Sequence, residues 1–218
     1  MAESLREILD AAARGVFPPA DGGTSVVPQP GGRDAGVIAF TAHSVVFTDE
    51  DEGWVRKTLA SLECDPPPEG GPPAATMSAR FLTAFAQRTG RATDTIDVLL
   101  TGTPLPGCPE VALTEVADPG HPRVVAARRR RDGVRVWSAD GGVLVLGRGV
   151  GGRLEVAVEV AEGARHRGLR RRLVTAARQL AGGEVVWAQV SAGNARSLRA
   201  FQAAGYRPVG SEALFLRP

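Results

Sequence analysis

The sequence predicts a mixed α/β protein in which helices pack against a mixed sheet, and three observations support this fold class. Apolar residues make up 43% and charged residues 23% of the 218 residues, the proportions of an ordinary globular protein. Stretches with the apolar spacing of amphipathic helices alternate with short β-rich runs along the chain. Clusters of glycine and proline separate these stretches, as is typical of loops.

The composition also argues against several classes of protein. No apolar run approaches the roughly 20 residues needed to span a bilayer. The first residues, MAESLREILD, lack the basic start and apolar core of a secretory signal. The two cysteines, Cys64 and Cys108, lie far apart without neighbouring histidines, which argues against a disulfide framework and a zinc site. We therefore expect no metal, no membrane association and a reducing, cytoplasmic setting.

Charge divides the chain into two unequal halves. The formal net charge of +2 combines −6 over residues 1–107 with +8 over residues 108–218. A polyanionic ligand would be attracted by the second half and repelled by the first. The stretch 102–109 (GTPLPGCP) is the best candidate for a domain boundary, because glycine and proline interrupt regular structure there. We expect an N-terminal α/β region at 1–107 and a second domain at 108–218.

In the first half, apolar spacing and capping residues predict helices at 3–13, from 49–51 to about 62, and from 78 to 90. The β-rich runs are 37–47, read as one buried strand or a tight pair, and 95–100, whereas 18–36 is expected to be a loop. If the 37–47 strand lies at a sheet edge, the other half or another subunit must cover it. The first half is therefore interpreted as a degenerate partner of the second half, a lid or a homodimer surface.

In the second half, three β-rich runs separated by glycine-containing turns predict an antiparallel meander. A helix, a strand, a helix and extended residues are expected to follow it. The elements in order are a short strand at 111–116, a helix at 122–131, the meander at 134–137, 143–146 and 154–160, a helix at 168–180, a strand at 185–190, a helix at 195–204, and extended residues 206–209 and 213–216.

The stretch between Leu154 and Leu173 predicts a phosphate site. A strand ends at Val160 and a helix begins near Gly168, so free backbone N–H groups and the helix dipole favour an anion at the helix start. The spacing matches neither a Walker loop nor a dinucleotide fingerprint, and a solvated basic helix start is the alternative. Gly168 lets a phosphate approach the backbone, and nearby arginines add positive charge; they are Arg165, Arg167, Arg170, Arg171 and Arg172.

Together with a second motif, this stretch resembles the GNAT N-acetyltransferase superfamily. The family's phosphate loop reads Arg/Gln-x-x-Gly-x-Gly/Ala between a strand and a helix. Residues 165–170 (RHRGLR) occupy those positions, with Arg170 where the family has Gly or Ala. The later family signature is an Asn, a helix and then Gly-Phe, and it is matched here by Asn194, Ser197, Leu198, Phe201 and Gly205-Tyr206. The resemblance covers roughly residues 111–218.

The resemblance implies a GNAT-like acetyl-CoA-binding fold in the second half, with acetyl-CoA as co-substrate in a splayed cleft of a mixed sheet. The strand before the loop would pair with the pantetheine arm, and a backbone N–H would polarise the acetyl carbonyl. Asn194, the only asparagine of the chain, would contact pantetheine and also cap its helix. The implied cofactor-binding residues are Val158, Val160, Arg165, His166, Arg167, Gly168, Leu169, Arg170, Asn194, Ser197 and Phe201.

Transfer of acetyl to an amine by direct attack also needs groups that move protons. Glu155 and Glu159 share a face of the 154–160 strand, where a carboxylate could take the ammonium proton, or where both could simply face solvent. The family often places a tyrosine, which acts as the general acid, seven residues after the asparagine, and that position is Phe201 here. Ser197, one turn earlier, is the substitute candidate, and water could also protonate the leaving thiolate.

The sequence therefore supports one principal hypothesis and two alternatives. The principal hypothesis is an N-acetyltransferase that acts on a small amine or a protein amino group, and the acidic first half suits a cationic acceptor. The absent tyrosine and Arg170 favour a non-catalytic CoA-binding sensor or interaction module instead. The arginine run 128–131 suggests nucleic-acid binding, which is disfavoured because no aromatic interleaving or groove-reading motif accompanies it.

Overall fold

The computed structural model describes residues 3–62, 75–165 and 167–217, so Cys64 and His166 lie outside the described residues. The chain forms two compact units, residues 1–98 with 209–218, and residues 99–208. Each unit combines helices with strands, which confirms the predicted mixed α/β class. Both unit boundaries fall inside strands, β4 (Ile96–Gly102) and β10 (Arg207–Leu216).

This division differs from the expected one at residue 107, and strand pairing gives the reason. The end of β10 pairs antiparallel with β2, with Ala213 opposite Val37, and so the last residues of the chain return to the first unit. Residues distant in sequence are joined here by backbone hydrogen bonds, which local composition does not reveal. The expected extended stretches 206–209 and 213–216 are parts of this one strand.

The first unit is built on β1, β2 and β3 together with β10. β2 and β3 form an antiparallel hairpin, which confirms the tight pair expected at 37–47, and β1 pairs in parallel with β3. β1 lies within the stretch expected to be a loop, because its four residues are flanked by glycine and proline. The strand bounds are Thr24–Val27 for β1, Asp34–Phe40 for β2 and His43–Phe47 for β3.

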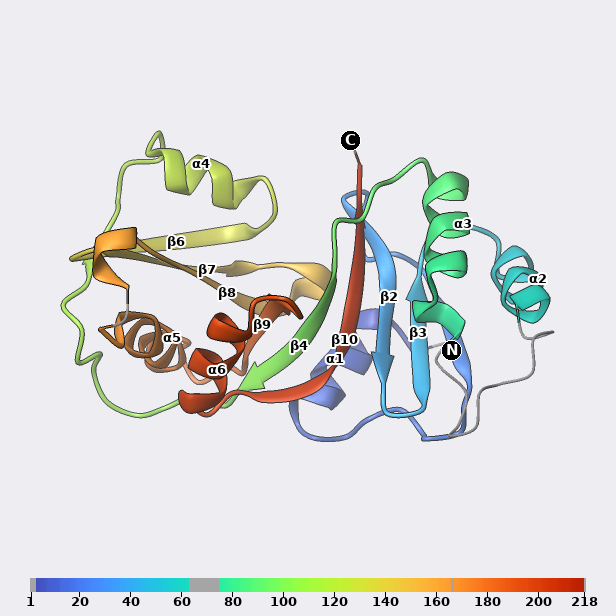
Figure 1. Ribbon diagram of the computed structural model, residues 1–218, viewed down its shortest axis with the longest axis horizontal. Helices are drawn as coiled ribbons and strands as arrows, with labels where there is room; N and C mark the ends of the chain where they lie inside the picture. The colour runs from blue at the N-terminus through green and yellow to red at the C-terminus, as the bar shows by residue number, and fades with distance from the viewer. Residues whose placement is uncertain (1–2, 63–74, 166, 218) are drawn as a thin grey trace. The chain divides into compact units, whose positions relative to one another are not determined.

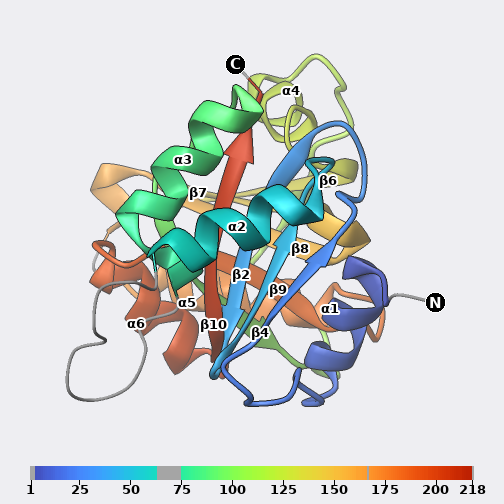
Figure 2. The same cartoon turned by 90° about the vertical axis from the view of Figure 1, so that its right-hand side faces the viewer.

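Three helices of the first unit begin and end where local chemistry predicts. α1 (Leu5–Ala13) starts with a capping box between Ser4 and Glu7. α3 (Ala79–Thr89) is capped by the Ser78 side chain and stops at Gly90, whose φ of 63° suits glycine. Together with α2 (Glu52–Leu62), α3 lies across one face of the strands (Figure 2). A short 3₁₀ turn at Ala75–Met77 precedes α3.

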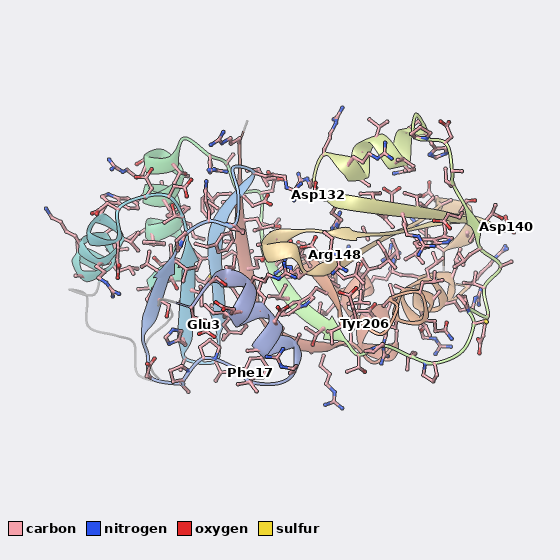
Figure 3. All side chains as sticks on the ribbon, turned by 180° about the vertical axis from the view of Figure 1, so that it is seen from behind. Glu3, Phe17, Asp132, Asp140, Arg148 and Tyr206 are labelled. Carbon is pink, nitrogen blue, oxygen red and sulfur yellow. The ribbon has the colours of Figure 1, made fainter. Side chains whose placement is uncertain are left out.

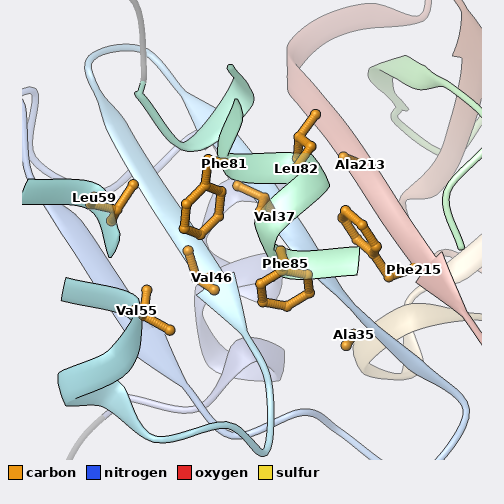
Figure 4. Close-up of a cluster of buried hydrophobic side chains, with 10 residues drawn as sticks. All are labelled: Ala35, Val37, Val46, Val55, Leu59, Phe81, Leu82, Phe85, Ala213 and Phe215. Atoms are coloured by element: carbon orange, nitrogen blue, oxygen red, sulfur yellow. The ribbon is translucent and has the colours of Figure 1, made fainter. Parts of the chain in front are cut away.

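The core of the first unit lies between α2, α3 and the strands (Figure 4). Phe85 of α3 meets Phe215 of β10 edge to face, with 4.8 Å between the ring centroids. Both rings are fully buried, so the last strand of the chain completes the apolar core of the first helices and strands. The other members of this cluster are Ala35, Val37, Val46, Val55, Leu59, Phe81, Leu82 and Ala213.

The second unit contains the predicted antiparallel meander. β5, β6, β7 and β8 pair antiparallel in order, and β8 then pairs in parallel with β9. The expected strand at 111–116 is reduced to the two residues of β5, Thr114–Glu115. The remaining bounds are Asp132–Ala139 for β6, Gly142–Arg148 for β7, Leu154–Val160 for β8 and Val186–Ser191 for β9.

Helices cover both faces of the meander (Figure 1). α4 (Pro122–Arg128) packs on one face, where Val124 and Ala127 meet Val136 and Val145. α5 (Leu169–Gln179) packs against β7 and β8 on the other face, and α6 (Ala195–Ala203) packs against α5. Short 3₁₀ turns at Val150–Gly152 and Glu162–Ala164 flank β8.

The two ends of the meander differ. Asp132 pairs with Arg148 at one end, while Asp140 lies in the β6–β7 turn at the other end (Figure 3). Val160 at the end of β8 lies opposite Gly142, so the loop after β8 begins at the Asp140 end. The α5 helix start is therefore placed at this end of the sheet.

Candidate functional site

β8 and β9 separate soon after they meet. Over the fully described residues of both strands, the parallel register comprises Leu154 opposite Val186 and Glu155 opposite Trp187. The remainder of β8, 156–160, continues along β7 on its other side. Backbone groups of β8 that would face β9 are therefore available to another partner, because a strand edge presents unpaired N–H and C=O groups.

A buried ion cluster holds the strands where they begin to separate. The Glu155 carboxylate is 3% exposed and lies 2.8 Å from Arg153 Nε and 3.1 Å from Arg131 Nε. It also accepts hydrogen bonds from the Val150 N–H and from Gln189 Nε2 of β9, both at 3.3 Å. Glu155 is thus enclosed by donors from four places in the unit, and this burial sets it apart from an open proton acceptor.

The loop between β8 and α5 is held close to the β6–β7 turn. The Ala161 N–H donates to the Gly141 carbonyl at 2.9 Å. A side chain at Gly141 would bring its Cβ within 2.4 Å of the Ala164 Cβ, and its φ of +75° also suits glycine. The turn is therefore shaped to let the loop after β8 pass close to it.

α5 starts at a glycine with left-handed backbone geometry. Gly168 is the N-cap residue, with φ +71° and ψ 4°, and as a glycine it has no side chain to cap the helix. The N–H groups of the first turn have no acceptor within the helix. Beyond Gly168 the nearest atom to an added Cβ is Arg172 Nη1, at 3.8 Å, so the loop is open at this point. The arrangement suits an anion that approaches the backbone.

A cavity of about 400 Å³ lies at this helix start, and all its lining residues belong to the second unit. The predicted cofactor residues that line it are Val160, Arg165, Gly168, Leu169, Arg170 and Asn194. Ala164, Arg171, Arg196 and Ala200 complete the lining. Four of these side chains are arginines and none is acidic, so the cavity favours an anionic ligand.

The start of α6 forms the opposite wall. Asn194 caps α6 by accepting the Ser197 N–H at 3.1 Å, as expected of a capping asparagine. The buried Ser197 hydroxyl accepts a hydrogen bond from Arg170 Nη1 at 2.6 Å. Arg170 therefore links the first turn of α5 to the first turn of α6 and remains half-buried beside the cavity.

Phe201 and Tyr206 pack together beneath α6. Their rings meet at 89° with 5.0 Å between centroids, and both are buried. The Tyr206 hydroxyl donates to the Val174 carbonyl at 3.1 Å, and burial raises the pKa of this phenol far above its usual range. The single tyrosine of the chain is thus occupied in the interior of the unit, at the position where the resembling family has an aromatic residue.

The remaining predicted site residues lie apart from the cavity lining. Glu159 is exposed on β8 and forms an ion pair with Arg123 of α4. Arg167 is exposed next to the loop, and its carbonyl accepts a hydrogen bond from Arg172 Nη1. Val158 is half-buried on the edge of β8 that leaves β9. His166 lies outside the described residues.

Ala164, Arg196 and Ala200 were missed by sequence reasoning, although Arg196 carries a usable signal. It stands in the first turn of α6, where the positive end of the helix dipole disfavours a cation. Arg170 and Arg171 stand in the same unfavourable place on α5. Arginines at two adjoining helix starts favour the binding of an anion between them. Ala200 offers no such signal, because only packing brings it to the cavity.

The separating parallel strands, the glycine-capped helix after β8 and the asparagine-capped helix after β9 are the elements that the resemblance to the GNAT superfamily predicts. No protein-family model matches the sequence, and no curated protein matches it.

Among solved structures, the chain is similar to a GCN5-related N-acetyltransferase from Kribbella flavida, with 18% identity, a TM-score of 0.42, and coverage of 63% of each chain. It is similar to a putative acetyltransferase of the GNAT family from Novosphingobium aromaticivorans, with 21% identity, a TM-score of 0.43, and coverage of 58% of this chain and 66% of that one. A tandem GNAT protein from the clavulanic acid biosynthesis pathway matches at 14% identity and a TM-score of 0.38, over 68% of this chain and 60% of that chain. The matched regions thus span less than two thirds of these solved chains.

Two further properties concern the described part of the chain. None of its helices combines the length and apolar character needed to cross a membrane. Within the same residues, no group of three or more His, Cys, Asp or Glu side chains is placed to hold a metal ion.

Proposed function

We propose that the protein is an acyl-CoA-dependent N-acetyltransferase that transfers acetyl from acetyl-CoA to an amine by direct attack in a ternary complex. The observation that carries this proposal is the arginine-lined cavity at the glycine-capped start of α5, beside the edge of β8 that β9 leaves unpaired. The cavity fits the diphosphate of CoA, because it combines backbone donors, cationic side chains and open space at one point.

In this proposal, different residues of the second unit bind different parts of acetyl-CoA. The first-turn N–H groups after Gly168 hold the diphosphate, and Arg165 neutralises part of its charge. The free edge of β8 around Val158 and Val160 pairs with the pantetheine amides, and Asn194 flanks that arm. Bound acetyl-CoA supplies an activated thioester, and a backbone N–H of β8 stabilises the developing oxyanion.

Glu159 is the proposed proton acceptor for the attacking ammonium group. It is exposed, whereas Glu155 lies among buried arginines. Its partner Arg123 belongs to the surface of α4 and can release the carboxylate at low cost, because an exposed ion pair contributes about 0–1 kcal/mol. Glu159→Gln should therefore lower kcat/KM by about 100-fold while acetyl-CoA binding is retained. An unchanged kcat/KM would contradict this role.

The acceptor is proposed to be a small amine or a protein amino group, cationic before it loses its proton. Residues 1–107 carry a net charge of −6, which favours approach of a cation. The proposed setting is the reducing cytoplasm, where the exposed thiol of Cys108 stays free.

A second function, a CoA-binding sensor without turnover, is favoured by one observation. Phe201 has no hydroxyl, and the Tyr206 hydroxyl is buried against Val174, so neither ring supplies an acid at the cavity. The Ser197 hydroxyl remains as a donor beside Arg170, and solvent can protonate the leaving thiolate. Release of CoA thiol measured across a panel of amines separates the two functions: an enzyme turns over, whereas a sensor binds without release.

Calorimetric titration with acetyl-CoA tests the site itself. We expect saturable binding that Gly168→Ala weakens about tenfold, because a side chain at φ +71° costs about 1–2 kcal/mol. Gly163→Ala is the matched control, since Gly163 lies in the same loop and an added Cβ there meets nothing within 4 Å. Absence of binding to the wild type would overturn the proposal.

A further inference from the structure

The charge around the cavity exceeds what a diphosphate alone requires. Arg165, Arg170, Arg171 and Arg196 line it, and none of its ten lining residues is acidic. The carboxylate of Glu162 lies 3.9 Å from Arg165 Nη1, but that carboxylate side chain is 92% exposed and outside the lining. The diphosphate diester of CoA carries two negative charges, and the N–H groups of α5 already serve it.

Arg170 shows that this positive charge is not balanced by the described residues. Its Nη1 donates to Ser197, while its buried Nε has no hydrogen-bond partner among the described residues. Burial lowers the pKa of its guanidinium, and the neighbouring charges of Arg165 and Arg196 lower it further. An anion in the cavity would relieve this repulsion and would meet an available donor.

The helix dipoles point to the same place. Arg170 and Arg171 stand in the first turn of α5, and Arg196 stands in the first turn of α6. Each of these positions is unfavourable for a cation, because a helix start is itself positive. Two helix starts and their arginines thus converge on one cavity from two elements. A monoanionic or neutral group there would leave most of this charge uncompensated.

We propose that Arg170 and Arg196 form a phosphomonoester subsite in this cavity, which for CoA receives the 3′-phosphate. A phosphomonoester adds about 1.5 to 2 negative charges at neutral pH and three acceptor oxygens. The two guanidinium groups come from different helices but line the same cavity, and their charges are close enough to interact, so one phosphate between them can contact both. The inference rests on the proposed function, since it names the part of CoA that these residues recognise.

Titration of the full chain with CoA and with dephospho-CoA tests the subsite, because the two ligands differ in this phosphate alone. We expect dephospho-CoA to bind about 10- to 100-fold more weakly, the effect of one or two charge-assisted hydrogen bonds. Arg196→Gln should bring the ratio of the two dissociation constants closer to one, mainly by weakening the binding of CoA. Arg170→Gln should act in the same direction. Arg199→Gln, an equal charge change at an exposed α6 residue outside the cavity lining, should leave the ratio unchanged.

Each other outcome has a definite meaning. Equal affinity of the wild type for the two ligands overturns the subsite and leaves the proposed function standing. If Arg196→Gln and Arg199→Gln weaken the binding of both ligands equally, the arginines act only through their overall positive charge, and the assignment to Arg196 is wrong. If neither ligand binds, the subsite and the proposed function fall together. Circular dichroism of each variant confirms that it is folded; Arg196 is exposed, so its substitution leaves the core intact.

Discussion

Glu155 and Glu159 stand on the same face of one strand, yet the fold gives them opposite environments. Glu155 is enclosed by Arg131, Arg153 and the strand that follows, whereas Glu159 reaches solvent beside Arg123. Alternation along a strand identifies a shared face but not what covers each part of it. The surrounding packing thus distinguishes the enclosed carboxylate of Glu155 from the solvent-exposed carboxylate of Glu159, for which we propose the role of proton acceptor.

The substitution Glu155→Gln should therefore destabilise the protein strongly. It removes the carboxylate that buried Arg153 and partly buried Arg131 contact, and breaking a buried pair in this way costs about 3–5 kcal/mol. Glu159→Gln is the matched control on the same strand, and its cost should stay within about 1 kcal/mol. Urea unfolding of both variants measures the difference. Equal free energies of unfolding would show that the ion cluster does not hold β8 and β9.

At the scale of elements, a series of side-chain hydrogen bonds links the edge strand β1 to β3. His43 of β3 contacts Asp21 through Nδ1 at 2.8 Å and Ser25 of β1 through Nε2 at 3.0 Å. Asp21 also accepts the Gly23 N–H at 2.7 Å. These hydrogen bonds hold the four-residue strand β1 in place, because the β-propensity of so short a strand would not do so alone.

The contribution of these hydrogen bonds to the free energy of unfolding should be lost at acidic pH. Hydrogen bonds to Asp21, first from His43 and then from the Gly23 N–H, lower its pKa in the folded state. A lowered folded pKa means that the contribution is present above the unfolded pKa of about 4 and is lost as pH falls through the folded pKa. Asp21→Asn should thus reduce the free energy of unfolding at pH 7, and the difference should vanish on acidification.

Urea unfolding of the wild type and of Asp21→Asn at several pH values between about 7 and 3 measures this difference. The same neutralisation at exposed Glu3 serves as the control, and its effect should be small throughout. A difference at Asp21 that stays constant with pH would contradict the assignment.

At the scale of the whole molecule, the end of the chain stabilises its beginning. Phe215 of β10 lies against Phe85, and Ala213 lies opposite Val37 of β2. Phe215→Ala should destabilise the first unit by about 3–5 kcal/mol, because it opens a cavity in a closed core. Hydrogen exchange should show faster amide exchange in β2 and α3. Val125→Ala, at a 43% exposed site, should change stability by about 0.5 kcal/mol or less. Equal exchange in the two variants would contradict this dependence.

Much of the element order followed from local chemistry. Ser4, Ser78 and Gly90 mark helix ends by their own hydrogen bonds and backbone angles, so the sequence predicts α1 and α3 closely. The meander was predicted because its turns contain glycine between β-rich runs. β1 was not predicted, because it is short and its pairing with β3 is parallel and nonlocal.

The sequence by itself determined the glycine-capped start of α5 and the asparagine cap of α6, because each depends on residues within one turn of a helix. It also determined the charge that surrounds them. Only the tertiary structure decided that Arg170 hydrogen-bonds Ser197 and that Arg196 lines the same cavity. It also decided that Glu155 is buried whereas Glu159 is exposed to solvent. Only it decided that residues 209–218 belong to the first unit. Local backbone chemistry fixes where helices begin, but packing between distant segments fixes which side chains meet and which remain in contact with water.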